Sequence, residues 1–223
     1  MFKGMHCVES GWGSCDYVKA EEAAGANKAG LWSMMVVPPW EWRKRKCKVY
    51  LAGPEVFFPD PQKEATLHKK VCEEYGFEGV FPLDNVPDIK GLAGWEAGEA
   101  IFNSNIDKID ECGALIANMT PFRGPGMDAG TAFEMGYASA QGKTTIGWSS
   151  DDRTYIDRVR EFYDGDLKQT DRWRDPNNLV VEDFGEPDNL MMSVAAIDVT
   201  TSFEGAVKLL SRVLEEIDKL ELN

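Results

Sequence analysis

The sequence has few of the residues from which metal centres and disulfide frameworks are built. Its 223 residues include two histidines and five cysteines, namely Cys7, Cys15, Cys47, Cys72 and Cys112, without a CxxC pair. An odd number of scattered cysteines is not typical of a disulfide-linked secreted protein or of a zinc ribbon. His6, Cys7 and Cys15 could contact a metal ion, but a fourth ligand at a familiar spacing is missing. We therefore expect a reduced, cytoplasmic protein with no metal site.

Positive charge is scarce as well. The chain has 24 Lys and Arg against 38 Asp and Glu, which gives a formal net charge of -14. Such a chain should repel phosphate backbones and anionic membranes. No apolar run approaches the length of a membrane span, and the N-terminus lacks the apolar core of a signal peptide. Nucleic acids and membranes are therefore not expected as partners, whereas uncharged nucleosides and free bases would not be repelled.

Clean periodicity is missing from residues 1–46, which we interpret as a partly irregular N-terminal extension. In residues 47–223, short apolar runs alternate with amphipathic segments, as in an α/β domain. Strands are expected at 49–52, 78–82, 113–120, 143–150 and near 197; helices at 62–75, 95–111, 131–141, 152–163 and 203–222; and a loop at 170–178. This alternation predicts a mainly parallel five-stranded sheet with helices on both faces. Ligands bind at the carboxyl ends of the strands in such sheets.

The stretch "GMDAGTAFEMGYASAQG", residues 126–142, brings two carboxylates to the start of a predicted helix. In one interpretation they are structural, because Thr131 and Glu134 have the spacing of a capping box. In the other, Glu134 lies in the first helical turn, stays ionised in its positive potential, and acts as a nucleophile. Asp128 would then approach the same pocket from its rim, as the second acid of a retaining glycosidase does.

Three segments resemble the nucleoside 2-deoxyribosyltransferase family: "KVYLAGP" (48–54), "IFNSNIDKIDECGALIANM" (101–119) and "DAGTAFEMGYASAQGK" (128–143). The resemblance extends over about residues 48–200. It implies a flavodoxin-like, doubly wound α/β sandwich and a double-displacement reaction without a cofactor. A 2'-deoxynucleoside would be cleaved, its sugar held covalently, and the sugar then passed to another free nucleobase.

The resemblance also implies roles for individual residues. Glu134 corresponds to the nucleophile, Asp128 to the acid that assists protonation of the base, and Tyr50 to the tyrosine that orients the nucleophile by a hydrogen bond. The remaining residues implied in substrate binding are Gly53, Pro54, Phe57, Phe58, Asn105, Gly130, Asn189 and Met191.

Several of these correspondences leave a choice open. Either Phe57 or Phe58 would form the aromatic wall against the base, because two residues are inserted after Gly53. Asn105 stands where many relatives carry an aspartate, and an amide cannot act as a base. The segment Asn189–Met191 resembles one that a neighbouring subunit contributes to the site, which implies a homo-oligomer, either a dimer or a hexamer.

Two other functions remain open on sequence grounds. The first is a hydrolase of the same superfamily that acts on 2'-deoxynucleoside 5'-monophosphates and needs a phosphate cradle. Residues 189–193 contain no Lys or Arg, which favours a nucleoside, but Arg123 and Gly124 could contact an anion. The second is a non-catalytic binding protein, in which Glu134 would only complete a helix cap.

Overall fold

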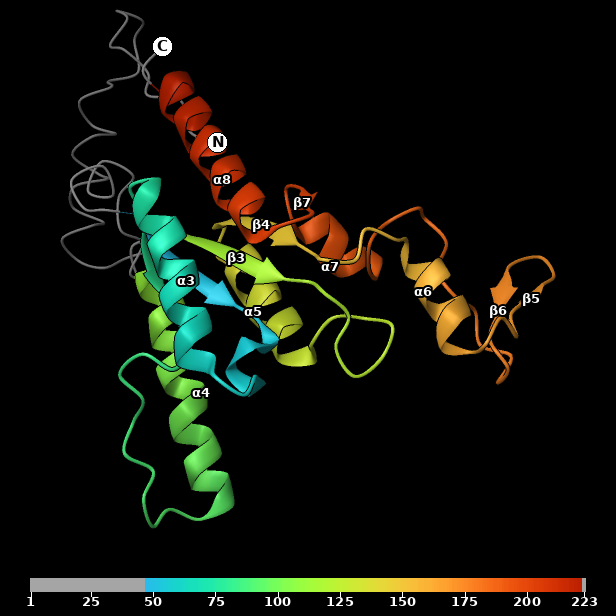
Figure 1. Cartoon of the computed structure of the whole chain (residues 1–223), viewed down its shortest axis with the longest axis horizontal. Helices are drawn as coiled ribbons and strands as arrows, with labels where there is room; N and C mark the ends of the chain where they lie inside the picture. The colour runs from blue at the N-terminus through green and yellow to red at the C-terminus, as the bar shows by residue number, and fades with distance from the viewer. Residues whose placement is uncertain (1–46, 222–223) are drawn as a thin grey trace, which may run out of the picture. The chain divides into compact units, whose positions relative to one another are not determined.

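The computed structural model describes residues 47–221 (Figure 1). The predicted N-terminal extension, residues 1–46, lies outside this range, as do His6, Cys7 and Cys15. Residues 46–213 form one compact unit. Within residues 47–221, no helix is both long enough and apolar enough to cross a membrane.

A five-stranded sheet forms the centre of the compact unit. Its strands are parallel and lie in the order β2-β1-β3-β4-β7. They are β1 (Lys48–Ala52), β2 (Glu78–Val80), β3 (Ala114–Asn118), β4 (Thr144–Trp148) and β7 (Val199–Thr200). This is the strand order 2-1-3-4-5 of flavodoxin-like sheets, so the predicted fold class is confirmed.

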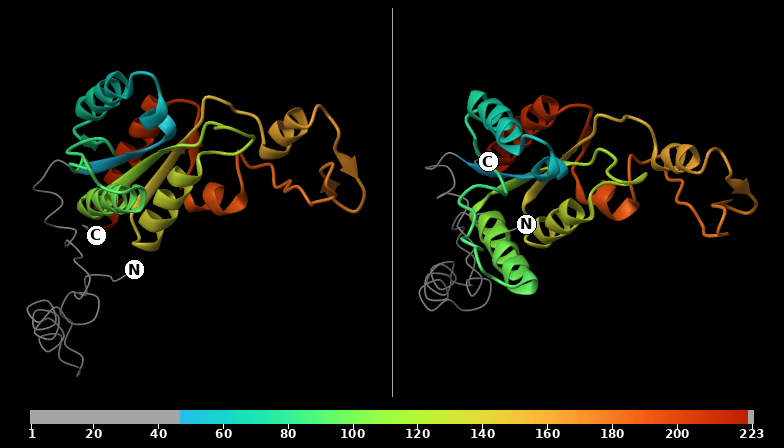
Figure 2. Two further views of the ribbon diagram at one scale, coloured as in Figure 1. Left: turned by 90° about the horizontal axis from the view of Figure 1, so that it is seen from below. Right: turned by 60° about the horizontal axis from the view of Figure 1, so that its bottom comes forward.

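Helices cover both faces of this sheet, as right-handed crossovers between parallel strands require. The helices of the described residues are α3 (Pro61–Glu74), α4 (Gly94–Glu111), α5 (Ala129–Ala140), α6 (Tyr155–Phe162), α7 (Leu190–Ala195) and α8 (Phe203–Glu221). Among them, α6 lies away from the sheet (Figure 1). Helix α3 and the start of α8 share one face, where the rings of His68 and Phe203 stack 3.9 Å apart. Helices α4 and α5 cover the opposite face (Figure 2).

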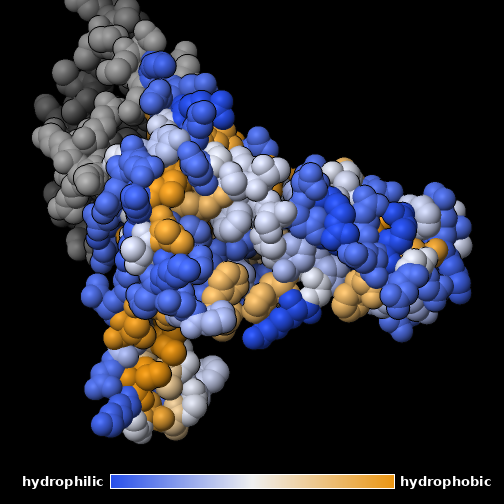
Figure 3. Space-filling view, in the orientation of Figure 1, coloured by the Kyte–Doolittle hydropathy of each residue, from blue (hydrophilic) through white to orange (hydrophobic). Residues whose placement is uncertain are grey.

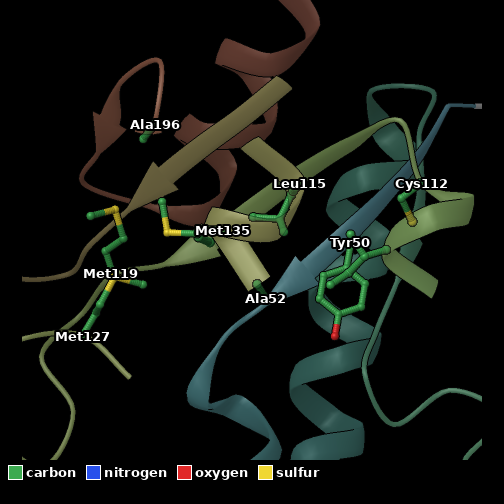
Figure 4. Close-up of a cluster of buried hydrophobic side chains, with 11 residues drawn as sticks. Tyr50, Ala52, Cys112, Leu115, Met119, Met127, Met135 and Ala196 are labelled. Atoms are coloured by element: carbon green, nitrogen blue, oxygen red, sulfur yellow. The ribbon is translucent and has the colours of Figure 1, made fainter. Parts of the chain in front are cut away.

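The core lies between the sheet and these helices. All five residues of β3 are buried, as expected for the middle strand of a parallel sheet covered on both sides. The side chains of Tyr50, Leu115 and Met135 belong to one buried cluster between β1, β3 and α5 (Figure 4). The first and third strands are thereby fixed against α5, and their carboxyl ends meet near its N-terminus.

The predicted loop at 170–178 is wrong in part. Within it, β6 (Trp173–Arg174) pairs antiparallel with β5 (Lys168–Gln169), which lies just before the predicted loop, so the two form a short hairpin. Trp173 packs against a small buried cluster that includes Ile156, Val159 and Val181. Strands of two residues are too short to show an alternating pattern, so tertiary packing rather than sequence period defines this hairpin.

Candidate active site

Helix α5 begins one turn earlier than the capping box predicts. Asp128 is its N-cap, and the Oδ2 atom of Asp128 accepts hydrogen bonds from the backbone N–H (2.9 Å) and the hydroxyl (3.0 Å) of Thr131. A Cβ at Gly130 would lie 3.1 Å from this oxygen, so glycine leaves room for the cap. Thr131 is thus the third helical residue and not the N-cap, and the capping-box interpretation is wrong.

Glu134 lies in the second turn of α5, where it can no longer serve as a cap. The hydroxyl of Tyr50 on β1 donates a hydrogen bond of 2.6 Å to its Oε1 atom. Within residues 47–221, the other carboxylate oxygen, Oε2, has no hydrogen-bond partner. The structure therefore holds one oxygen of this carboxylate in place and leaves the second available.

The charge state of Glu134 differs from the sequence expectation. Its pKa is raised to about 7, chiefly by burial; the hydrogen bond from Tyr50 lowers the pKa in part, and the nearby charge of Asp128 raises it. The positive potential of a helix terminus fades within the first turn, so desolvation outweighs it here. Glu134 is consequently balanced between its acid and its carboxylate near neutral pH.

Tyr50 is suited to act only as a donor toward this carboxylate. Its side chain is fully buried in β1. Burial raises the pKa of the phenol strongly, and the negative charge of Glu134 raises it further. Since the phenol keeps its proton, its hydrogen bond stabilises the ionised form of Glu134.

Residues that follow β1 form the neighbouring part of this edge. Gly53 and Pro54 are buried and lead into a short 3-10 helix, η2 (Pro54–Phe57). The ring of Phe57 stacks on that of Phe122 with centroids 5.6 Å apart. The Arg123 guanidinium lies over both rings, 5.3 Å from the centroid of Phe57 and 4.6 Å from that of Phe122. Phe57 is thus connected to the loop that leads to Asp128.

Residues 49–191 match the sequence model of the family described as Nucleoside 2-deoxyribosyltransferase. The chain belongs to this family. A 2-desoxiribosyltransferase from Leishmania mexicana has a similar structure, with 34% identity and a TM-score of 0.59 over 74% of this chain and 97% of that one. A 2-deoxyribosyltransferase from Bacillus psychrosaccharolyticus is 19% identical, with a TM-score of 0.42 over 68% of this chain and 98% of that one.

An uncharacterized protein of Schizosaccharomyces pombe is also related. It is 37% identical over 128 residues, which are 56% of this chain and 60% of that protein. The chain therefore spans less than two thirds of the length of this relative.

Not every residue implied by the family resemblance is hydrogen-bonded to Glu134 within residues 47–221. Asn105 is half-buried on α4, and its side chain makes no hydrogen bond within residues 47–221. Asn189 is the N-cap of α7, where its side chain accepts from the N–H of Met191 (3.0 Å) and donates to Glu182 (2.7 Å). Met191 itself is 71% exposed. Both ends of the Asn189 amide are therefore used within its own chain.

Sequence reasoning missed two buried carboxylates at this edge of the sheet. Glu55 accepts a hydrogen bond of 2.8 Å from the amide of Asn118, whose own oxygen accepts from the N–H of Thr120 (2.9 Å). Burial raises the pKa of Glu55. Asp188, immediately before Asn189, is buried as well. Neither position belongs to a motif, so only the folded structure reveals them.

Metal binding finds no support in the part of the chain that the structure describes. Residues 47–221 contain no group of three or more His, Cys, Asp or Glu side chains that could hold a metal ion. Cys47, Cys72 and Cys112 are free thiols. Burial raises the pKa of Cys112 to about 12, so this thiol stays protonated and unreactive.

Proposed function

We propose that the protein transfers the 2-deoxyribosyl group between nucleobases, with Glu134 as the covalent nucleophile. The observation that carries this proposal is the 2.6 Å hydrogen bond from Tyr50 to Glu134 at the carboxyl edge of the sheet. It joins residues 84 positions apart in sequence and fixes one carboxylate oxygen. The name of the Leishmania mexicana relative, a 2-desoxiribosyltransferase, supports the same substrate class.

The first half of the reaction breaks the bond between C1' of the sugar and the base nitrogen. The electron pair of that bond leaves with the base, and Asp128, once it has taken up a proton from water, passes that proton to the base. The Oε2 atom of Glu134 bonds to C1' as positive charge develops there. Proton transfer to a departing group of this kind typically contributes roughly 10²–10⁴-fold.

The second half reverses these roles. A different base attacks C1', the bond to Glu134 breaks, and Asp128 takes up the proton that the incoming base loses. The Tyr50 hydroxyl stays on Oε1 throughout, where it stabilises the carboxylate as it departs. No metal or organic cofactor is needed for either half.

Mixing the enzyme with 2'-deoxyinosine and no acceptor base tests the proposal directly. We expect intact-protein mass spectrometry to detect an added deoxyribosyl mass, and adenine to discharge it as deoxyadenosine. Base release without exchange would favour the hydrolase. Neither adduct nor free base would leave the non-catalytic binding protein as the better interpretation.

The activity should depend on pH through the ionisation of Glu134. Because attack needs the carboxylate and burial raises its pKa to about 7, the active fraction increases as the pH rises through that value. We expect kcat/KM for base release from 7-methyl-2'-deoxyguanosine, whose cationic base needs no proton from Asp128, to increase about tenfold per pH unit below 7 and to level off above it. A profile that stays flat from pH 5 to 8 would contradict this assignment.

Phe57, rather than Phe58, is proposed as the wall against the base. Stacking on one base is worth roughly 1–3 kcal/mol, so Phe57→Ala should raise KM for the nucleoside about 5- to 160-fold. Phe58→Ala is the matched control, since this ring makes no ring contact within residues 47–221, and a change below about twofold is expected. Steady-state kinetics of both variants decide the choice; a larger effect of Phe58→Ala reverses it.

A 5'-monophosphate hydrolase is the second candidate, and Arg123 is the observation that favours it. Its guanidinium is exposed on the Phe57 and Phe122 rings, and no carboxylate within residues 47–221 forms an ion pair with it. A phosphate on the sugar could bind there. Comparing base release from deoxyinosine with that from its 5'-monophosphate separates the two candidates.

We also propose that the enzyme is a homo-oligomer in which the segment Asn189–Met191 completes a neighbour's site. Large apolar side chains are exposed on α4, among them Trp95 (82%) and Phe102 (50%). Figure 3 shows the apolar surface over this helix and the segment before it. A surface of this kind is typical of an interface between subunits.

A further inference from the structure

The buried carboxylate of Asp188 connects two segments of the candidate site. It is 3% exposed. Its Oδ2 atom accepts hydrogen bonds from the backbone N–H of Met127 (2.9 Å) and from Nη2 of Arg158 (3.3 Å). Its Oδ1 atom accepts from the backbone N–H of Asn189 (2.8 Å). One side chain thus holds the residue before Asp128 and the residue that begins α7.

The bond to Met127 bears on the direction in which Asp128 points. The Met127 side chain belongs to the buried cluster of Figure 4, and the hydrogen bond from its backbone N–H to Asp188 holds the residue at a second point. Oδ2 of Asp128 is already bound twice by Thr131. Oδ1 of Asp128 has no hydrogen-bond partner within residues 47–221, so backbone position at 127–128 determines where this free oxygen lies.

The partner of Asp188 is unusual for a purely structural pair. Arg158 on α6 is as deeply buried as Asp188, with both side chains 2% exposed. Two of its nitrogens, Nε and Nη1, have no hydrogen-bond partner. A buried ion pair with unsatisfied donors adds little net stability over apolar residues of similar volume. The hydrogen bond to Met127 gives the pair a function that apolar residues could not supply.

We propose that Asp188 is a positioning residue that holds Met127 so that the free oxygen of Asp128 reaches the departing base. This inference rests on the proposed function, in which Asp128 gives the base its proton. Arg158 neutralises the buried carboxylate and thereby keeps it an acceptor for two backbone N–H groups. The effect that Asp188 exerts through Met127 therefore lies in the step in which the base is protonated.

Two substrates separate this step from the rest of the reaction. The base of 2'-deoxyinosine must gain a proton as the bond to C1' breaks. In 7-methyl-2'-deoxyguanosine the base is already a cation, and the electron pair of the broken bond neutralises it, so no proton is needed. A variant that mispositions the proton donor slows only the first substrate.

The test uses the double variant Asp188→Asn with Arg158→Met. An asparagine can accept at only one of its two side-chain positions, and removing both charges together avoids a lone buried ion. We expect kcat/KM for deoxyinosine to fall roughly 10- to 100-fold. This is less than the full contribution of proton transfer to the rate, because Asp128 is still present but is out of position. For 7-methyl-2'-deoxyguanosine, kcat/KM should fall less than about threefold. The ratio of the two values from one preparation does not depend on how much protein is folded.

Asp128→Asn is the reference and should show the same selective loss. Glu182→Gln is the matched control, since Glu182 binds Asn189 and the N–H of Leu190 but not Met127; it should leave the ratio unchanged. Equal losses on both substrates in the double variant would overturn the positioning role, as would an altered ratio in Glu182→Gln. A wild-type enzyme that releases base from neither substrate would instead overturn the proposed function as well.

Discussion

Replacing Glu134 by glutamine is expected to lower the rate of base release on the order of 10⁴-fold or more, as removal of a covalent nucleophile typically does. The amide keeps the shape of the side chain, and its oxygen can still accept the hydrogen bond from Tyr50. It lacks the negative charge that attacks C1' and stabilises the developing cation. The change should therefore remove the chemistry and leave α5 in place. Absorbance assays of base release and intact-protein mass spectrometry, which should detect no adduct, measure the effect.

Glu55→Gln is the matched control for this variant. Glu55 is also a buried carboxylate at the carboxyl edge of the sheet with a pKa raised by burial, but its contact is Asn118 and not Tyr50. We expect it to retain activity within about tenfold of the wild type, because glutamine can still accept this hydrogen bond. Similar losses in the two variants would contradict a special role for Glu134.

Stability gives an independent measure of the same carboxylate. Its pKa rises from 4.5 to about 7 on folding, so the folded chain binds more protons than the unfolded chain between these values. The free energy of unfolding therefore decreases as the pH rises through this window. Glutamine has no proton to lose. Glu134→Gln should accordingly have a higher Tm than the wild type at pH 8 and a similar Tm at pH 4, by thermal denaturation.

The sequence was sufficient for the parts of the fold that rest on local pattern. The apolar runs of β1, β3 and β4 and the helices between them predicted a parallel sheet with its ligand edge at the carboxyl ends. The pairing of Tyr50 with Glu134 came from the family resemblance alone. No local pattern connects two residues that are 84 positions apart.

For other features the sequence allows two alternatives and does not decide between them. Asp128 and Thr131 are both good N-cap residues three positions apart, and either could begin α5. The pKa of Glu134 was expected to stay low because the residue lies near the N-terminus of a helix, where the potential is positive. The burial that raises this pKa depends on the tertiary fold and cannot be seen in the local sequence. Asp188 follows no motif, and its importance lies in contacts with Met127 and Arg158, which are distant in sequence.

Replacing Asp128 by asparagine separates its two roles, that of helix cap and that of proton donor. Asparagine caps a helix about as well as aspartate, so α5 should begin at the same residue. It cannot give the base a proton, and base release from deoxyinosine should fall by roughly 10²–10⁴-fold. Steady-state assays at pH 8, with circular dichroism to verify helix content, measure the loss.

The same substitution should also move the pH profile of the residual activity. The charge of Asp128 raises the pKa of Glu134, so removing that charge lowers this pKa below about 7. A larger fraction of Glu134 is then ionised at pH 6. For 7-methyl-2'-deoxyguanosine, which needs no proton, the activity of the variant relative to wild type should therefore be higher at pH 6 than at pH 8. An unshifted profile with activity within about threefold of the wild type would mean that Asp128 only caps α5, since a proton donor contributes far more. A shifted profile with a large loss requires that the two carboxylates share one site, because a charge remote from Glu134 would leave its titration unchanged.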